Sequence, residues 1–128
     1  MLSFEEVGGI LDSAADELPK EFFKDLNGGV ILLPEACRDD EDASIYTLGE
    51  YIHDEIGRYI VIYYGSFAAL YKNSPPEKLR KELRETLIHE FLHHIESLAG
   101  EYGLEIEDEQ EMERFRASGR RRKGTRRK

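Results

Sequence analysis

Two histidines and a glutamate in the second half of the chain have the spacing of a metal-binding motif. Residues His89, Glu90 and His93 form the pattern H-E-x-x-H. Side chains at positions i and i+4 of a helix lie within about 40° of each other, so both imidazoles can bind one metal ion while Glu90 flanks them. Such imidazole pairs bind Zn²⁺, which lowers the pKa of a bound water towards about 7, and a neighbouring carboxylate accepts the proton as the water attacks a carbonyl group. The motif predicts one zinc ion per chain, with His89 and His93 as ligands and Glu90 as general base.

A third protein ligand is expected, because a catalytic zinc ion usually has three, which leaves one position for water. His53 is one candidate. Glu96 shares the helical face of the two histidines, but it lies about 7 Å along the helix axis from the midpoint of the pair. Asp108 follows two glycines, at positions 100 and 103, where the chain can turn back over the metal. Asp108 is therefore the preferred candidate, with Glu96 its main rival.

One long helix is predicted to carry the motif. Ser74, Pro75 and Pro76 supply a start signal, and Gly100 a stop signal. Apolar residues lie largely on the side opposite the histidines: Ile88, Phe91, Leu92 and Ile95. His94 points about 100° away from His93, so it is expected to pack or to form hydrogen bonds. The helix thus has a metal face and a core face.

The other elements predict an α+β fold. Ser3 and Glu6 form a capping box that begins an amphipathic helix, which ends at Pro19, and a short helical piece follows. β-branched and aromatic residues predict strands over 30–33, 46–52 and 58–64. The acidic stretch 34–44 is predicted to be an exposed loop. We expect a small mixed or antiparallel sheet, packed with the N-terminal helix and the long H-E-x-x-H helix.

Length and charge indicate one domain with a basic tail. The 128 residues have a net charge of -9, yet seven of the 18 Lys and Arg residues follow residue 119 and all 27 Asp and Glu residues precede residue 114. The domain is expected to span residues 1–116. Residues 117–128 carry almost no apolar surface and are predicted to be disordered, with weak contact to RNA or an anionic surface.

The sequence favours a cytoplasmic location. No apolar run approaches the roughly 20 residues that a membrane-spanning helix needs. The first residues lack a secretory signal, and Cys37 is the only cysteine, so no intramolecular disulfide is expected. The sequence does not indicate an oligomeric state.

The chain resembles the small bacterial zincin-like metallopeptidases, minimal zincins long catalogued as a domain of unknown function. The likeness spans most of residues 3–112 and is most specific at 89–94. In that family the motif continues as H-E-x-x-H-x-x-G-x-x-D, with the Asp completing the metal site. Here Glu96 and Ala99 occupy the Gly and Asp positions. An insertion would bring Asp108 into the family's Asp position, so the resemblance implies Asp108 as the third ligand.

The expected function is a zinc-dependent metallopeptidase or related amide hydrolase that acts on a peptide or protein. Zincins commonly pair an extended peptide with an edge strand beside the metal helix, and residues 46–52 or 58–64 are the candidates for that strand. The alternative is a non-catalytic module that zinc stabilises and whose basic tail binds RNA or the ribosome.

Overall fold

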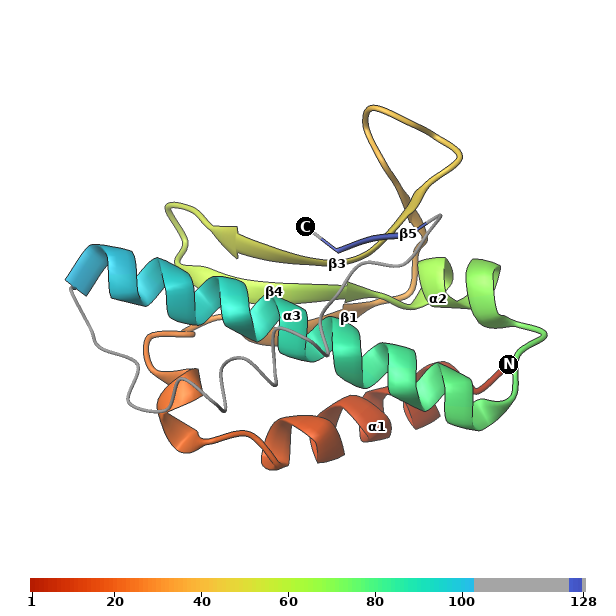
Figure 1. The fold of residues 1–128 in the computed structure, drawn as a ribbon, viewed down its shortest axis with the longest axis horizontal. Coiled ribbons are helices and arrows are strands. Elements are labelled where there is room, and N and C mark those ends of the chain that lie inside the picture. Colours follow the sequence, from red (N-terminus) through yellow and green to blue (C-terminus); the bar gives the residue numbers. More distant parts are fainter. Residues whose placement is uncertain (103–124, 128) are drawn as a thin grey trace.

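The fold is α+β, with three α-helices and a mixed sheet. The computed structural model describes residues 1–102 and 125–127 (Figure 1). Along the chain the elements are α1 (Phe4–Asp16), the 3-10 helix η1 (Lys20–Phe23), β1 (Gly29–Leu33), β2 (Cys37–Arg38), β3 (Tyr46–His53), β4 (Arg58–Tyr63), α2 (Tyr64–Tyr71), α3 (Pro76–Tyr102) and β5 (Thr125–Arg127).

The strand order of the sheet is β1-β4-β3-β2, and β5 also pairs with β3. β1 runs parallel to β4, with Val30 opposite Ile60. β3 runs antiparallel to β4, with Tyr51 opposite Ile60. Because β4 has a neighbour on each side, it is not an edge strand. Of the two strands considered for peptide pairing, β4 therefore has no free edge, whereas β3 pairs with β4 over residues 49–53 and with β2 and β5 over residues 46–49.

Helix α1 begins as its capping box predicts. The Ser3 hydroxyl accepts a hydrogen bond from the backbone N–H of Glu6 (3.1 Å), and the Glu6 carboxylate accepts one from the Ser3 N–H (3.1 Å). Val7 and Leu11 are its buried residues. The Glu17 carboxylate at its C-terminal end pairs with Arg84 of α3, an ion pair that links the two helices.

One core joins every layer. Helix α3 crosses one face of the sheet, and α1 lies beside it (Figure 1). The core cluster includes Leu48, Ile60 and Ile62 from the sheet, and the α3 residues Leu79, Leu83, Leu87, Ile88, Phe91 and Leu92. The predicted core face of the long helix is confirmed, since Ile95 packs against the same cluster.

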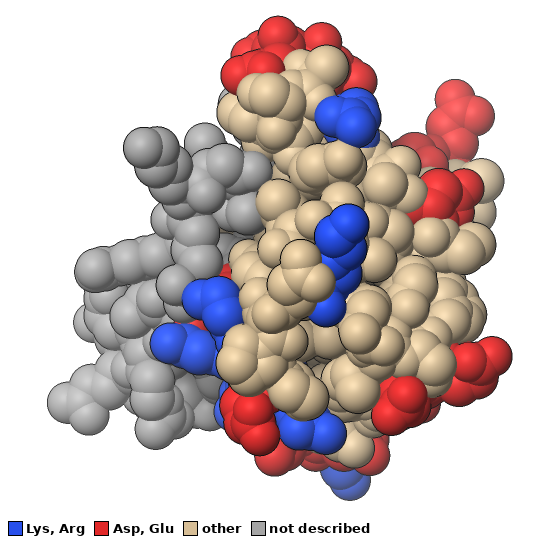
Figure 2. Space-filling view, turned by 90° about the vertical axis from the view of Figure 1, so that its right-hand side faces the viewer, with Lys and Arg blue, Asp and Glu red and all other residues tan. Residues whose placement is uncertain are grey.

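The acidic stretch 34–44 is only partly an exposed loop. Cys37 and Arg38 form β2, which pairs with Thr47 and Tyr46. Asp39 is buried, and its Oδ1 accepts hydrogen bonds from the backbone N–H groups of residues 41 and 42. The following residues 40–44 are exposed and protrude from the molecule (Figure 1), and Figure 2 shows acidic side chains gathered at this tip.

Two helical features differ from the prediction. Helix α2 starts directly after β4 with no side-chain cap and was not predicted, because the capping and turn signals that mark a helix start are lacking there. Helix α3 continues past Gly100 to Tyr102, so the predicted stop signal at this glycine is wrong.

Strand β5 falls within the segment that the sequence predicts to be disordered. Thr125–Arg127 pair in parallel with Tyr46, Thr47 and Gly49 of β3. Strand pairing uses backbone groups and needs no apolar side chain, which is why composition alone does not reveal it. Within the described part of the chain, no helix has the length and apolar character to cross a membrane.

Candidate metal centre

The two motif histidines of α3 converge on each other. Their Nε2 atoms are 3.0 Å apart, and the rings stand nearly perpendicular, at 89°. Two imidazole nitrogens bound at about 2.0–2.1 Å to one tetrahedral zinc ion lie about 3.3 Å apart. In the structure the two nitrogens are at hydrogen-bonding distance, so His89 and His93 lie close enough together that they could bind one ion. Both side chains are partly exposed, which leaves a route to solvent.

Glu90 leaves α3 on the side that faces the sheet. Its side chain is fully buried, and its Cγ would lie 3.3 Å from a Cβ at Gly49 of β3. The placement suits a general base that neighbours the His89–His93 pair without being a ligand.

Gly49 is a close-packed position beside Glu90 that the sequence analysis missed. A Cβ there would meet Thr86 Cγ2 at 2.9 Å and Ile62 Cδ1 at 3.1 Å. The absence of a side chain lets α3 approach β3 closely at Glu90. A glycine inside a predicted strand often marks such a close approach, and that signal was present in the sequence.

His94 is a structural histidine, as predicted. Its Nε2 is 2.7 Å from the carbonyl of Lys24, so Nε2 carries the proton, because a carbonyl only accepts. Nδ1 then accepts from the Tyr51 hydroxyl at 2.8 Å. Burial lowers the pKa of His94, although the bond to the Lys24 carbonyl opposes this effect. Both ring nitrogens are occupied, so this side chain is not placed to bind a metal.

The third ligand is not found in the described part of the chain. Asp108, the preferred candidate, lies outside the described residues. Glu96 is exposed on α3, and His53 is exposed at the end of β3. Among residues 1–102 and 125–127, no three His, Cys, Asp or Glu side chains come together as a metal site. The described residues therefore fit two ligands of a zinc ion and not the complete set.

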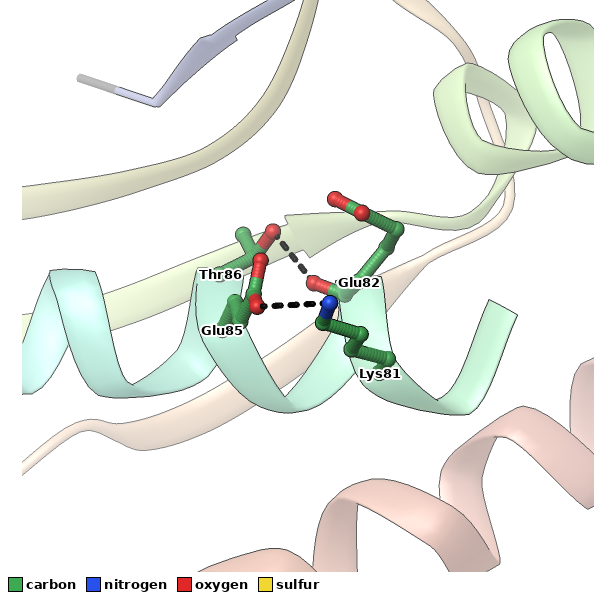
Figure 3. A network of polar contacts seen from close by, with 4 residues as sticks. All are labelled: Lys81, Glu82, Glu85 and Thr86. Atoms are coloured by element: carbon green, nitrogen blue, oxygen red, sulfur yellow. Dashed lines mark hydrogen bonds and ion pairs between the residues drawn. The ribbon is translucent and has the colours of Figure 1, made fainter. Parts of the chain in front are cut away.

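A buried polar row on α3 includes the candidate base. Glu82, Thr86, Glu90 and His94 follow one another at four-residue intervals, and all four are fully buried. Figure 3 shows Glu82 and Thr86 near one another on α3, and the Thr86 hydroxyl donates to the Glu82 carbonyl at 2.8 Å. Lys81 and Glu85 form an ion pair one position away. Sequence reasoning missed this row, because polar residues at helical spacing usually face solvent.

A separate groove of about 490 Å³ lies between α1 and α3. Its lining includes Ser13 and Glu17 of α1 and Arg80 and Arg84 of α3. None of the motif residues lines it. The groove is therefore not part of the candidate metal centre.

The chain is similar to a solved structure. No family model and no curated protein matches the chain. A solved structure of a conserved hypothetical protein from Thermus thermophilus is 31% identical, with a TM-score of 0.69. The match covers 77% of this chain and 99% of that one. The chain belongs to the same family as this conserved hypothetical protein.

Proposed function

We propose that the chain is a zinc-dependent peptidase or related amide hydrolase of the minimal zincin type. The observation that carries the proposal is the convergence of the His89 and His93 Nε2 atoms to 3.0 Å beside the buried Glu90. The α+β architecture supports it, because one long helix presents the motif against a small sheet. Asp108 is the proposed third ligand.

The proposal assigns a separate role to each residue of the motif. His89 and His93 would hold the ion, which would supply a Lewis acid for the attacking water and the substrate carbonyl. Glu90 accepts a proton from the attacking water and returns it to the leaving amine. The packing of Glu90 against Gly49 restricts its rotamers, so the carboxylate is oriented before substrate binds.

Substitution of Glu90 by Gln tests this assignment. The change preserves size and removes the proton acceptor, so zinc binding and folding should be retained. Turnover of an unstructured peptide library should fall by about 10²- to 10⁴-fold, the usual contribution of a positioned acid or base. Glu77→Gln, an exposed glutamate at the start of α3, is the matched control and should leave turnover unchanged.

Three outcomes would argue against the proposal. Undiminished turnover in Glu90→Gln would mean that another group activates the water. Loss of zinc from the same variant would make Glu90 a ligand. Failure of the parent protein to cleave any peptide when loaded with zinc would favour the non-catalytic module.

A further inference from the structure

Thr86 lies one helical turn before Glu90 on α3, and both side chains are fully buried. Residues four positions apart on a helix are neighbours on one face. Gly49 of β3 lies opposite them, because a Cβ at this glycine would be 2.9 Å from Thr86 Cγ2 and 3.3 Å from Glu90 Cγ. The two side chains therefore converge on the space above the Gly49 backbone.

Ile62 of β4 packs at the same place. It is fully buried and lies opposite Gly49 in the pairing of β3 with β4, and its Cδ1 would be 3.1 Å from the same Cβ position. Where neighbours pack this closely, a side chain has room for few rotamers. The aliphatic part of Glu90 thus lies in a niche formed by Gly49, Thr86 and Ile62.

A hydrogen bond within α3 determines which group of Thr86 faces this niche. The Thr86 hydroxyl donates to the Glu82 carbonyl at 2.8 Å (Figure 3). A threonine in a helix has two accessible χ1 rotamers, and a bond to the carbonyl four residues earlier selects one of them. With the hydroxyl held there, the methyl carbon Cγ2 is the group that points at Gly49. The methyl wall beside Glu90 is therefore fixed by a bond inside the same helix.

We propose that Thr86 is a positioning residue that holds Glu90 in one rotamer, and that it does so through its methyl group. The hydroxyl of Thr86 orients the methyl and has no other part in the proposal. Thr86 acts through Glu90 and is not assigned a step in the reaction. That the carboxylate held in this way is a general base rests on the proposed function, whereas the rotamer itself does not.

The rotamer of Glu90 can be measured without any activity. Three-bond NMR couplings from its Cγ to the backbone nitrogen and carbonyl carbon report χ1 in the metal-free full chain. The parent should show one staggered rotamer. Thr86→Ser keeps the hydroxyl and removes the methyl, so its couplings should be an average over two or more rotamers. Thr86→Val should restore the couplings of the parent, because the favoured helical rotamer of valine puts its methyl groups where threonine has Cγ2 and Oγ1.

Ile88→Val is the matched control for the loss of one buried methyl group. Ile88 lies on the same helix and belongs to the core cluster, and its side chain is rotated about 200° around the helix axis from Thr86. This variant should leave the couplings of Glu90 as they are in the parent. Averaged couplings in Ile88→Val as well would mean that general loosening of α3 frees Glu90, which contradicts a specific role of Thr86.

Turnover of the peptide library by the zinc-loaded protein is the second measurement. In Thr86→Ser, kcat should fall by about 10- to 100-fold, as expected for a misplaced reacting group, while KM and zinc affinity stay unchanged. Thr86→Val should turn over as the parent does. Unchanged couplings in Thr86→Ser, or averaged couplings with an undiminished kcat, overturn the proposal. If the parent cleaves no peptide, the peptidase function fails, and the couplings alone decide whether Thr86 holds Glu90.

Discussion

The three histidines of α3 differ in the partners of their ring nitrogens. His94 uses both nitrogens within the fold, for the Lys24 carbonyl and the Tyr51 hydroxyl. His89 and His93 direct one nitrogen each at the other, 3.0 Å apart. Position on the helix decides this difference, since His94 is rotated about 100° from its neighbour towards the core.

Alanine substitutions should separate these roles. His89→Ala and His93→Ala should each abolish tight zinc binding, because each removes one of the expected ligands. His94→Ala should keep zinc binding and lower the free energy of unfolding by about 2–5 kcal/mol, because it empties a buried site and leaves two hydrogen-bonding groups unpaired. Isothermal titration with Zn²⁺ and urea denaturation measure the two effects.

If His94→Ala fails to fold, His94→Gln serves in its place, since the amide can both donate and accept at similar positions. Equal loss of zinc in all three variants would mean that the helical geometry is misassigned.

The third ligand can be assigned by comparing the zinc affinities of alanine variants. Asp108→Ala should weaken zinc binding more than Glu96→Ala does, because Glu96 lies about 7 Å along the helix axis from the midpoint of the histidine pair. A competition titration against a chromophoric chelator gives the two affinities. A larger loss in Glu96→Ala would show that α3 unwinds near its end to bring this carboxylate to the ion.

The sequence predicts relations between residues that are close together in one helix. It does not predict contacts between residues that meet only when the helix packs on the sheet. The relation between His89 and His93 follows from helical periodicity alone. The burial of Glu82 and the contact between Gly49 and Glu90 depend on where β3 crosses α3. Gly49 inside a predicted strand signals a close approach, but no local pattern identifies Glu90 of α3 as its partner, so the contact itself appears only in the folded chain.

At the scale of elements, the crossing of β3 under α3 is the contact that positions Glu90, the proposed general base. Gly49→Ala should lower the free energy of unfolding by about 1–3 kcal/mol, because the added Cβ would lie 2.9 Å from Thr86 Cγ2 and force the helix outwards. The same shift moves Glu90, so turnover should fall as well. Thermal unfolding followed by circular dichroism measures the first effect.

Gly9→Ala is the matched control for this substitution. Gly9 lies within α1, and a Cβ there would meet nothing within 4 Å. Alanine at this position should raise the stability by up to about 1 kcal/mol, through helix propensity. Destabilisation of similar size in both variants would show that space at Gly49 is not the cause.

The elements that the sequence predicted are those with their own start signals or strong periodicity. α1 has its capping box, and α3 has its prolines and regular leucines. β2, α2 and β5 were missed because each owes its conformation to neighbours. β2 and β5 exist through pairing with β3, and α2 follows β4 without a loop or a cap.

At the scale of the whole molecule, we predict that the core forms without a metal ion. The cluster of buried apolar residues joins α1 and α3 to the sheet. A zinc-stapled module shows the opposite pattern, because its fold is lost without the ion. A fold that is stable without zinc would therefore favour a catalytic role of the ion over a structural one.

The response of the fold to zinc follows from this arrangement. The protein freed of metal by a chelator should remain folded and unfold cooperatively, because its core is complete. Zinc at about 100 times its dissociation constant should then stabilise it by about 2.7 kcal/mol, since it binds only the folded chain. For a chain of this length that corresponds to a rise in Tm on the order of 5–15 °C.

The His89→Ala/His93→Ala double variant should show the same metal-free Tm within a few degrees and no rise with zinc. A chain that is unfolded without zinc would make the ion a structural staple and favour the non-catalytic module over the peptidase.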